Sequence, residues 1–448
     1  MLELISSGLM SVWLQMAKLP DPLQLTVSLV VAQDTPWGMF PGQPDPETEA
    51  LIRQYLKTLS DQGLSADNQG IWLQSGFSFL AENQGTTPLP AASVTKVATS
   101  LVALQSWGPD HQFETLISAT GPIQDGVLQG DLVVQGTGDP LFVWEEAIAL
   151  GNDLNRLGIR KVTGQLIVTG NFLMNFETDQ QKAGELLKQA LNAKKWSTET
   201  EAQYQLLPPG TPRPQVDIAG PVQTVTYGAS LLPNQTPLVR HRSLPLLQIV
   251  KLMNIYSNNV IAETLGSLQG GGGAVAQQAA QLAGVPAAEI SLINGSGLGM
   301  ENRISPRAAC ALFAALQRSL LAHNHTLADL FPIAGVDRGS IEGRRIPAAA
   351  VVKTGTLNEV SALAGVLPTR DRGLVWFAIL NRGTDLEGLR HQQDVLLQTL
   401  INRWGTSVDP PVAISPTAPL HSATKVLGDD RRNDVVRSAV EINTYSGS

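Results

Sequence analysis

Residues 90–105 read PAASVTKVATSLVALQ, and this stretch decides the fold because a serine and a lysine stand three positions apart at the start of an apolar helical pattern. Pro90 and two alanines precede Ser93, which places the serine at the N-terminus of the predicted helix. The spacing puts the amine of Lys96 beside the hydroxyl of Ser93 on one helix face, and the helix end adds positive potential there. Because a serine hydroxyl needs a base at neutral pH, we interpret Ser93 as a candidate nucleophile and Lys96 as its base.

A second polar signature, Ser257-Asn258-Asn259, interrupts an amphipathic segment between Ile255 and Val260. Alone, such a triplet is typical of a helix cap or a turn. Paired with a serine-lysine site, Ser257 can pass a proton towards a leaving amine, and the amide of Asn259 can hold the peptide carbonyl of a substrate.

The third signature, Lys353-Thr354-Gly355, follows the β-rich run AAAVV and therefore lies on a predicted strand. The edge of such a strand can pair with an extended peptide. Lys353 and Thr354 could bind a terminal carboxylate, while Gly355 lets the substrate backbone approach closely. The N–H groups of Thr356 and Ser93 could form an oxyanion hole.

Both ends of the chain contribute α/β elements, whereas the middle is strand-rich. A predicted helix and two strands follow residue 46, and three strands and a long helix end near residue 404. This arrangement predicts an α+β fold in which an antiparallel sheet flanked by helices is built from both ends and is interrupted by an inserted domain. The glycines at 270–273 are interpreted as a loose loop between helices.

The predicted division of the chain follows from these changes in pattern. The first residues form an apolar stretch of signal-peptide length that carries Glu3 in place of a positive region. The last residues are rich in proline and charge. We expect a possible export segment or membrane anchor over 1–24, a catalytic domain over 25–124 and 241–405, an inserted strand-rich domain over 125–240, and a disordered tail over 406–448.

Composition excludes several classes of protein. A formal charge of −8 argues against a nucleic-acid binder, which needs a basic surface to neutralise phosphates. The single cysteine, Cys310, lies in an apolar run and permits no intrachain disulfide. His323 and His325 lack nearby partners, so we predict neither a metal site nor a cofactor.

The three signatures, in this order, resemble the class C penicillin-binding proteins, the D-alanyl-D-alanine carboxypeptidase and endopeptidase family of the penicillin-binding protein 4 type. The segments VVQGTGDP, YSNNVIAETL, INGSGLGMENRISP and KTGTLNEVSALAGVL support the resemblance. It implies a serine β-lactamase/transpeptidase-like catalytic domain with an insertion between the first two signatures. The 161 positions from Lys96 to Ser257 are short for two nested insertions, so we expect one inserted domain or a reduced pair.

The resemblance also implies an activity, partners and a compartment. Peptides of peptidoglycan would be cut as a carboxypeptidase, an endopeptidase or both, through an acyl-enzyme on Ser93, and β-lactam antibiotics would acylate the same serine covalently. The protein would work in the periplasm or cell envelope, with peripheral or anchored membrane association as a possibility. By the same resemblance, Ser93, Lys96 and Ser257 are catalytic, and the substrate-binding residues are Asn259, Lys353, Thr354, Gly355 and Thr356.

Two alternatives stay open from the residues alone. A serine β-lactamase shares the acylation chemistry but needs a positioned base for deacylation. Glu289 stands at the wrong spacing from Asn294 for that role, and Asn258 replaces the aspartate of class A enzymes. A non-catalytic peptidoglycan-binding protein of the same fold is the second alternative. Asp139 and the segment 294–299 could shape the cleft, but we interpret them as turns.

Overall fold

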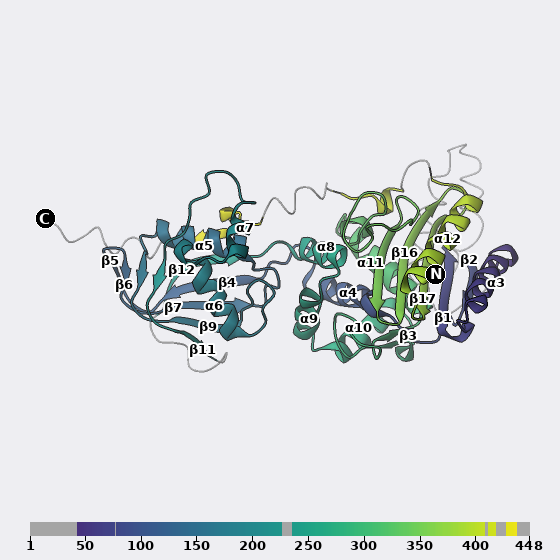
Figure 1. The fold of residues 1–448 in the computed structure, drawn as a ribbon, viewed down its shortest axis with the longest axis horizontal. Coiled ribbons are helices and arrows are strands. Elements are labelled where there is room, and N and C mark those ends of the chain that lie inside the picture. Colours follow the sequence, from purple (N-terminus) through teal and green to yellow (C-terminus); the bar gives the residue numbers. More distant parts are fainter. Residues whose placement is uncertain (1–42, 77, 226–234, 408–410, 418–426, 437–448) are drawn as a thin grey trace, which may run out of the picture.

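The computed structural model describes residues 43–76, 78–225, 235–407, 411–417 and 427–436, which form two lobes (Figure 1). The predicted export segment, residues 1–24, lies outside these ranges. In the part of the chain that is described, no helix is both long and apolar enough to cross a membrane.

The larger lobe is built on a five-stranded sheet in which every strand pair is antiparallel. The strand order is β15-β16-β17-β1-β2, so strands from the two ends of the chain meet in the middle, where Gln69 pairs with Asn381. The strands are β1 (Gln69–Ser75), β2 (Ser78–Asn83), β15 (Val351–Leu357), β16 (Val360–Thr369) and β17 (Gly373–Arg382). The predicted fold class, an α+β protein with an antiparallel sheet built from both ends, is confirmed.

Helices cover both faces of this sheet and enclose two apolar cores. On one face, α3 and α12 pack over a core that includes Ile71, Phe377 and Leu397. On the other face lie α4, α10 and α11, with α8 and α9 beside α4. The helices are α3 (Pro46–Asp61), α4 (Lys96–Trp107), α8 (Leu246–Tyr256), α9 (Asn259–Leu268), α10 (Gly272–Ala283), α11 (Pro306–Leu321) and α12 (Leu386–Trp404).

The smaller lobe has its own core and two sheets. A six-stranded sheet has the order β11-β9-β7-β4-β12-β18, and a small four-stranded sheet has the order β10-β8-β6-β5. Side chains from both sheets share one buried cluster. The strands are β4 (Glu114–Ala119), β5 (Ile123–Gln124), β6 (Val127–Leu128), β7 (Leu132–Thr137), β8 (Lys161–Val162), β9 (Leu166–Asn171), β10 (Asp217–Ile218), β11 (Val222–Val225), β12 (Thr236–Arg242) and β18 (Asn433–Val435).

This lobe differs from the sequence prediction in two respects. Its sheet begins with β4, before the expected boundary at residue 125, because β4 pairs with β7 and β12. It also contains three helices in the region that was predicted to be strand-rich, and one of them buries Ala147, Leu150 and Leu154 on one face against the sheet. The helices are α5 (Trp144–Arg156), α6 (Gln180–Ala190) and α7 (Thr198–Tyr204).

The C-terminal region returns to the smaller lobe, so the expectation of a disordered tail over 406–448 does not hold for its described residues. Strand β18 pairs with the outer edge of β12, where His241 lies opposite Asn433. Edge strands present unpaired backbone groups, and β18 satisfies those of β12. A 3₁₀ turn over Val412–Ile414 packs on the larger lobe through Ile414.

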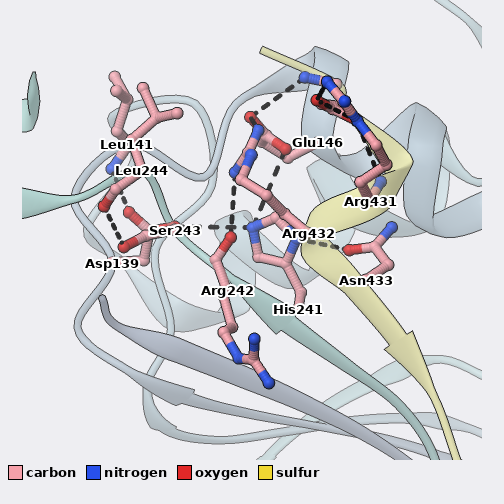
Figure 2. A network of polar contacts seen from close by, with 12 residues as sticks. Asp139, Leu141, Glu146, His241, Arg242, Ser243, Leu244, Arg431, Arg432 and Asn433 are labelled. Carbon is pink, nitrogen blue, oxygen red and sulfur yellow. Dashed lines mark hydrogen bonds and ion pairs between the residues drawn. The ribbon is translucent and has the colours of Figure 1, made fainter. Parts of the chain in front are cut away.

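A buried polar network joins this C-terminal strand to α5. Figure 2 shows the guanidinium of Arg432 against the carboxylate of Glu146, with the His241 ring beside Asn433. Burial raises the pKa of Glu146 to about 7, although Arg432 opposes this shift, and burial lowers the pKa of His241 to about 4. A carboxylate in this position needs its cation, because an unpaired charge in a protein interior is strongly unfavourable.

Candidate active site

Ser93 lies in a 3₁₀ turn, Ala92–Thr95, that leads directly into α4, as its position before an apolar helical pattern predicts. Ala92 has a φ of 45°, a left-handed conformation that is uncommon for a residue with a Cβ. The Nζ of Lys96 lies 2.9 Å from the Oγ of Ser93, and the lysine side chain is wholly buried. The nucleophile and base candidates therefore meet one helical turn apart.

Two further oxygens contact the same amine. Asn259 Oδ1 lies 2.8 Å from Lys96 Nζ, and the main-chain oxygen of Ser296 lies at 2.8 Å. Burial lowers the pKa of Lys96 from 10.5 to about 7, and the negative charge of Glu263 acts in the opposite direction. An appreciable fraction of the Lys96 amine is therefore neutral at physiological pH.

The loop that supplies the Ser296 oxygen is fixed from two sides. Glu263 on α9 accepts hydrogen bonds from the N–H groups of Gly295 and Ser296, each at 3.2 Å. Thr99 on α4 donates to the Gly295 oxygen at 2.7 Å. The loop contains the turn predicted over 294–299, and through the Ser296 oxygen it also forms a wall of the site.

The second signature lies at the junction of α8 and α9, where the chain reverses. Ser257 has a φ of 53° and ends α8, and Asn258 caps α9 by accepting from the N–H of Ile261 at 3.0 Å. The cap interpretation of the triplet and the site interpretation are therefore both compatible with the structure. Asn258 closes the turn, while Ser257 and Asn259 face the lysines of the other two signatures.

The third signature lies on β15, an edge strand of the five-stranded sheet. Lys353 Nζ donates to Ser257 Oγ at 3.0 Å and to the Thr354 oxygen at 2.8 Å. Burial and the nearby charge of Lys96 lower the pKa of Lys353 well below 10.5. A Cβ on Gly355 would lie 2.9 Å from the nitrogen of Ser93, so only glycine permits this close approach of strand and turn.

Thr354 and Thr356 project from the other face of the strand, because alternate residues of a strand face the same side. Thr354 Oγ1 donates to Ser340 Oγ at 2.9 Å, and Arg390 Nη2 donates to Thr356 Oγ1 at 2.9 Å. Thr356 is exposed, whereas Thr354 is buried. Each of the two hydroxyls is thus held by a side chain from outside the strand.

The three predicted signatures converge in the structure. Lys96 joins the first to the second through Asn259, Lys353 joins the third to the second through Ser257, and Gly355 lies against the Ser93 nitrogen. Sequence reasoning missed four contributors to this cluster, which are Glu263, the Ser296 carbonyl, Ser340 and Arg390. Only Glu263 carried a signal, since it follows Asn259 by four positions and therefore shares its helix face.

No group of three or more His, Cys, Asp or Glu side chains among the described residues is placed to hold a metal ion. His325, one of the two histidines considered in the sequence, instead contacts Asp329 and Thr417.

Several solved structures share the fold of this chain. A predatory endopeptidase from Bdellovibrio bacteriovorus, solved with an immunity protein, superposes with a TM-score of 0.63 at 23% identity, over 76% of this chain and 96% of that one. Penicillin-binding protein 4 from Haemophilus influenzae superposes with a TM-score of 0.58 at 21% identity, over 78% and 100%. The fold is that of the serine hydrolases that bind penicillin.

Sequence comparisons give the family. The model of the D-Ala-D-Ala carboxypeptidase 3 (S13) family matches residues 53–199 and 218–402. The D-alanyl-D-alanine carboxypeptidase DacB of Haemophilus influenzae is 26% identical over 389 residues, covering 66% of this chain and 80% of the relative. A carboxypeptidase of Mycobacterium tuberculosis is 25% identical over 360 residues, covering 70% and 75%. The chain belongs to the D-Ala-D-Ala carboxypeptidase 3 (S13) family, and it is a serine-type D-Ala-D-Ala peptidase.

Proposed function

We propose that this peptidase cleaves the D-alanyl-D-alanine bonds of peptidoglycan peptides in the cell envelope through an acyl-enzyme on Ser93. The observation that carries the proposal is the position of Lys96 Nζ, within 2.9 Å of three oxygens. A neutral amine has two hydrogens and one lone pair. It can therefore donate to Asn259 and to the Ser296 carbonyl while it accepts the proton of the Ser93 hydroxyl.

The second step needs an acid that protonates the leaving amine. Ser257 Oγ accepts from Lys353, which leaves its own hydrogen free to be donated. Ser257 can give this hydrogen to the leaving amine as the carbon–nitrogen bond breaks, and the proton that Lys96 took from Ser93 can then restore the Ser257 hydroxyl. Asn259 accepts from Lys96 through Oδ1, so its Nδ2 group is left to donate to the carbonyl of the substrate backbone.

Binding of the substrate follows from the strand that bears the third signature. The outer edge of β15 forms a backbone hydrogen bond near the start of the strand, where the Val352 N–H donates to the Pro332 oxygen at 3.1 Å. An extended peptide can add alongside the remainder of the strand. The contact between Gly355 and the Ser93 nitrogen then brings the scissile carbonyl towards the N–H groups of Ser93 and Thr356, which we assign to the oxyanion hole.

β-Lactam antibiotics are expected to acylate Ser93, and the Bdellovibrio endopeptidase has been solved in a form acylated by penicillin G. The β-lactamase alternative requires rapid deacylation. Glu289, the carboxylate considered for that role, is bound instead to Ser305 and Arg307. This favours a stable adduct over turnover of the drug. We place the activity in the periplasm, where such peptides occur.

A fluorescent penicillin tests the proposal directly. The wild-type protein should give a stable labelled band, and Ser93→Ala should give none because the bond to the drug is made by that hydroxyl. Incubation with muropeptides, followed by mass analysis, should show loss of D-alanine from pentapeptides or conversion of cross-linked dimers to monomers. Absence of label on folded wild-type protein would favour the non-catalytic alternative, and rapid hydrolysis of the penicillin would favour the lactamase.

A further inference from the structure

Lys251 on α8 is a buried lysine whose amine takes no part in the proposed proton transfers. Its Nζ donates to the Ala328 oxygen at 2.8 Å, to the Phe331 oxygen at 2.5 Å and to Asp337 Oδ2 at 3.0 Å. The side chains of Lys251 and Asp337 retain only 4% and 3% exposure. All three hydrogens of the ammonium group are therefore used, as a buried cation requires.

The oxygens that Lys251 binds belong to one stretch of chain, residues 328–340, which we call the bridging loop. Asp337 Oδ2 also accepts from the Ile333 N–H at 2.9 Å, so this carboxylate joins two parts of the loop. Ile333 in turn pairs with Val351 at the start of β15. The Lys251 amine thus fixes a loop that begins beside the strand of the third signature.

The other end of the bridging loop contacts the last turn of α8, just before Ser257. The Ser340 N–H donates to the Ile255 oxygen at 2.9 Å, and this carbonyl is one of those that a helix end leaves without a helical partner. Gly339 has a φ of 81°, and a Cβ there would lie 2.5 Å from the same oxygen. Only glycine therefore permits this close approach of the loop to the helix.

The conformation of Ser257 makes this outside support important. Its φ of 53° lies outside the helical region, so the hydrogen bonds within α8 do not by themselves fix its hydroxyl. A general acid acts only within hydrogen-bond reach of the atom that it protonates. A displacement of about 1 Å can lower the rate about 100-fold.

We propose that Lys251 is a positioning residue for proton donation by Ser257. Paired with Asp337, it fixes the bridging loop, and the loop holds the end of α8 so that the Ser257 hydroxyl lies within reach of the leaving amine. This inference rests on the proposed function, because it concerns the proton donor of the same reaction.

Two substrates that differ in one atom of the scissile bond test the inference: an acylated L-Lys-D-Ala-D-Ala peptide, and the same compound with sulfur in place of the scissile nitrogen. The amide nitrogen must take a proton as it leaves, whereas a thiolate can leave without one. In Lys251→Met, kcat/KM for the amide should fall about 10-fold or more, while kcat/KM for the thioester stays close to the wild-type value. A residue that only stabilises the fold would lower both by the same factor.

A second variant disturbs the bridging loop without breaking the buried ion pair. In Gly339→Ala the added Cβ presses on the Ile255 oxygen, so the selective loss on the amide should recur. Lys188→Met is the matched control, because Lys188 on α6 of the smaller lobe also donates to a main-chain oxygen, that of Gly220, at 2.6 Å. It should change neither rate.

A double-mutant cycle shows whether Lys251 acts through Ser257. Adding Lys251→Met to Ser257→Ala should cause little further loss on the amide, because the proton donor is already absent. Thermal unfolding of each variant checks that the fold is kept. If the unpaired Asp337 carboxylate prevents folding of Lys251→Met, the comparison is made with Lys251→Met/Asp337→Asn, which buries no unpaired charge.

Equal losses on the amide and the thioester in the folded variants would overturn the inference, as would an unchanged amide rate or fully additive losses in the cycle. An amide rate that is unchanged in Ser257→Ala itself would remove the proton donor and the role of Lys251 with it. Failure of the proposed function looks different, because the wild type would then cleave neither compound and would not be labelled by penicillin.

Discussion

Lys353 and Ser257 are 96 residues apart in the chain, yet the lysine amine donates to the serine hydroxyl at 3.0 Å. This contact joins the sheet to the junction between α8 and α9, and it places the Lys353 amine beside the proposed proton donor, Ser257. The proposed proton path is therefore built from two parts of the chain that this hydrogen bond joins.

Replacement of Ser257 should impair peptide cleavage without unfolding the protein. In Ser257→Ala, the leaving amine loses its proposed proton donor, so kcat/KM should fall about 100-fold or more. The measurement is steady-state hydrolysis of a D-Ala-D-Ala peptide. Ser267→Ala, an exposed serine on the neighbouring helix α9, is the control and should behave as the wild type. Unchanged cleavage by Ser257→Ala would remove this residue from the proposed mechanism.

Acylation should depend on pH through Lys96. The pKa of this amine is lowered to about 7 by burial, and only the neutral amine can accept the Ser93 proton. The rate of labelling by penicillin should therefore rise with pH through about 7 and level off above 8. At pH 6, about one tenth of the lysine is neutral, so the labelling rate there should be about one tenth of the plateau rate. A rate that does not vary between pH 5.5 and 8.5 would contradict Lys96 as the base.

Glu263 should affect the same pH dependence of penicillin labelling. Its charge raises the pKa of Lys96 and its oxygens hold the loop at Gly295 and Ser296, so Glu263→Gln removes both effects in part. The midpoint of the labelling profile should move to lower pH, and the plateau rate should fall about 10-fold. Glu301→Gln, an exposed glutamate just beyond the same loop, should change neither. A midpoint that moves to higher pH would contradict the claim that the Glu263 charge raises the pKa of Lys96.

Arg432, the residue just before the C-terminal strand β18, should stabilise the smaller lobe. Arg432→Ala leaves the buried Glu146 carboxylate without its ion-pair partner, and loss of one partner of a buried pair costs about 3–5 kcal/mol. Urea unfolding should show an earlier transition for this lobe, while penicillin labelling of the folded protein stays unchanged. Arg431→Ala is the control, because Arg431 is exposed and pairs with Asp429. Equal destabilisation by both variants would count against the buried pair.

Much of the fold and the core of the site could be predicted because the catalytic residues lie in short sequence patterns that also predict the local secondary structure. The serine-lysine spacing places two side chains on one helix face wherever that helix lies, and a β-rich run before Lys353 indicates a strand. The helix Trp144–Arg156 could also have been predicted from the sequence, since its apolar residues recur at helical spacing. Short strand-like pieces on either side of it led to the strand-rich interpretation instead.

Other features depend on tertiary contacts and leave no local trace. The glycines at 270–273 were interpreted as a loose loop, but α10 begins at Gly272. A Cβ there would lie 2.3 Å from the Asn294 nitrogen, so the glycine is required by a loop 22 residues away. The oxygen that Ser296 offers to Lys96 belongs to the main chain, and any residue type could supply it. Arg390 comes from a distant helix, and no spacing links it to Thr356.

The pairing of β1 with β17 has a consequence for synthesis of the chain. Gln69 emerges early and must wait for Asn381 before the central strand pair of the sheet can form. The nucleophile candidate is likewise made long before Lys353. A chain that ends before β15 and β17 therefore carries an incomplete pocket, and the site can form only after these late strands have been made.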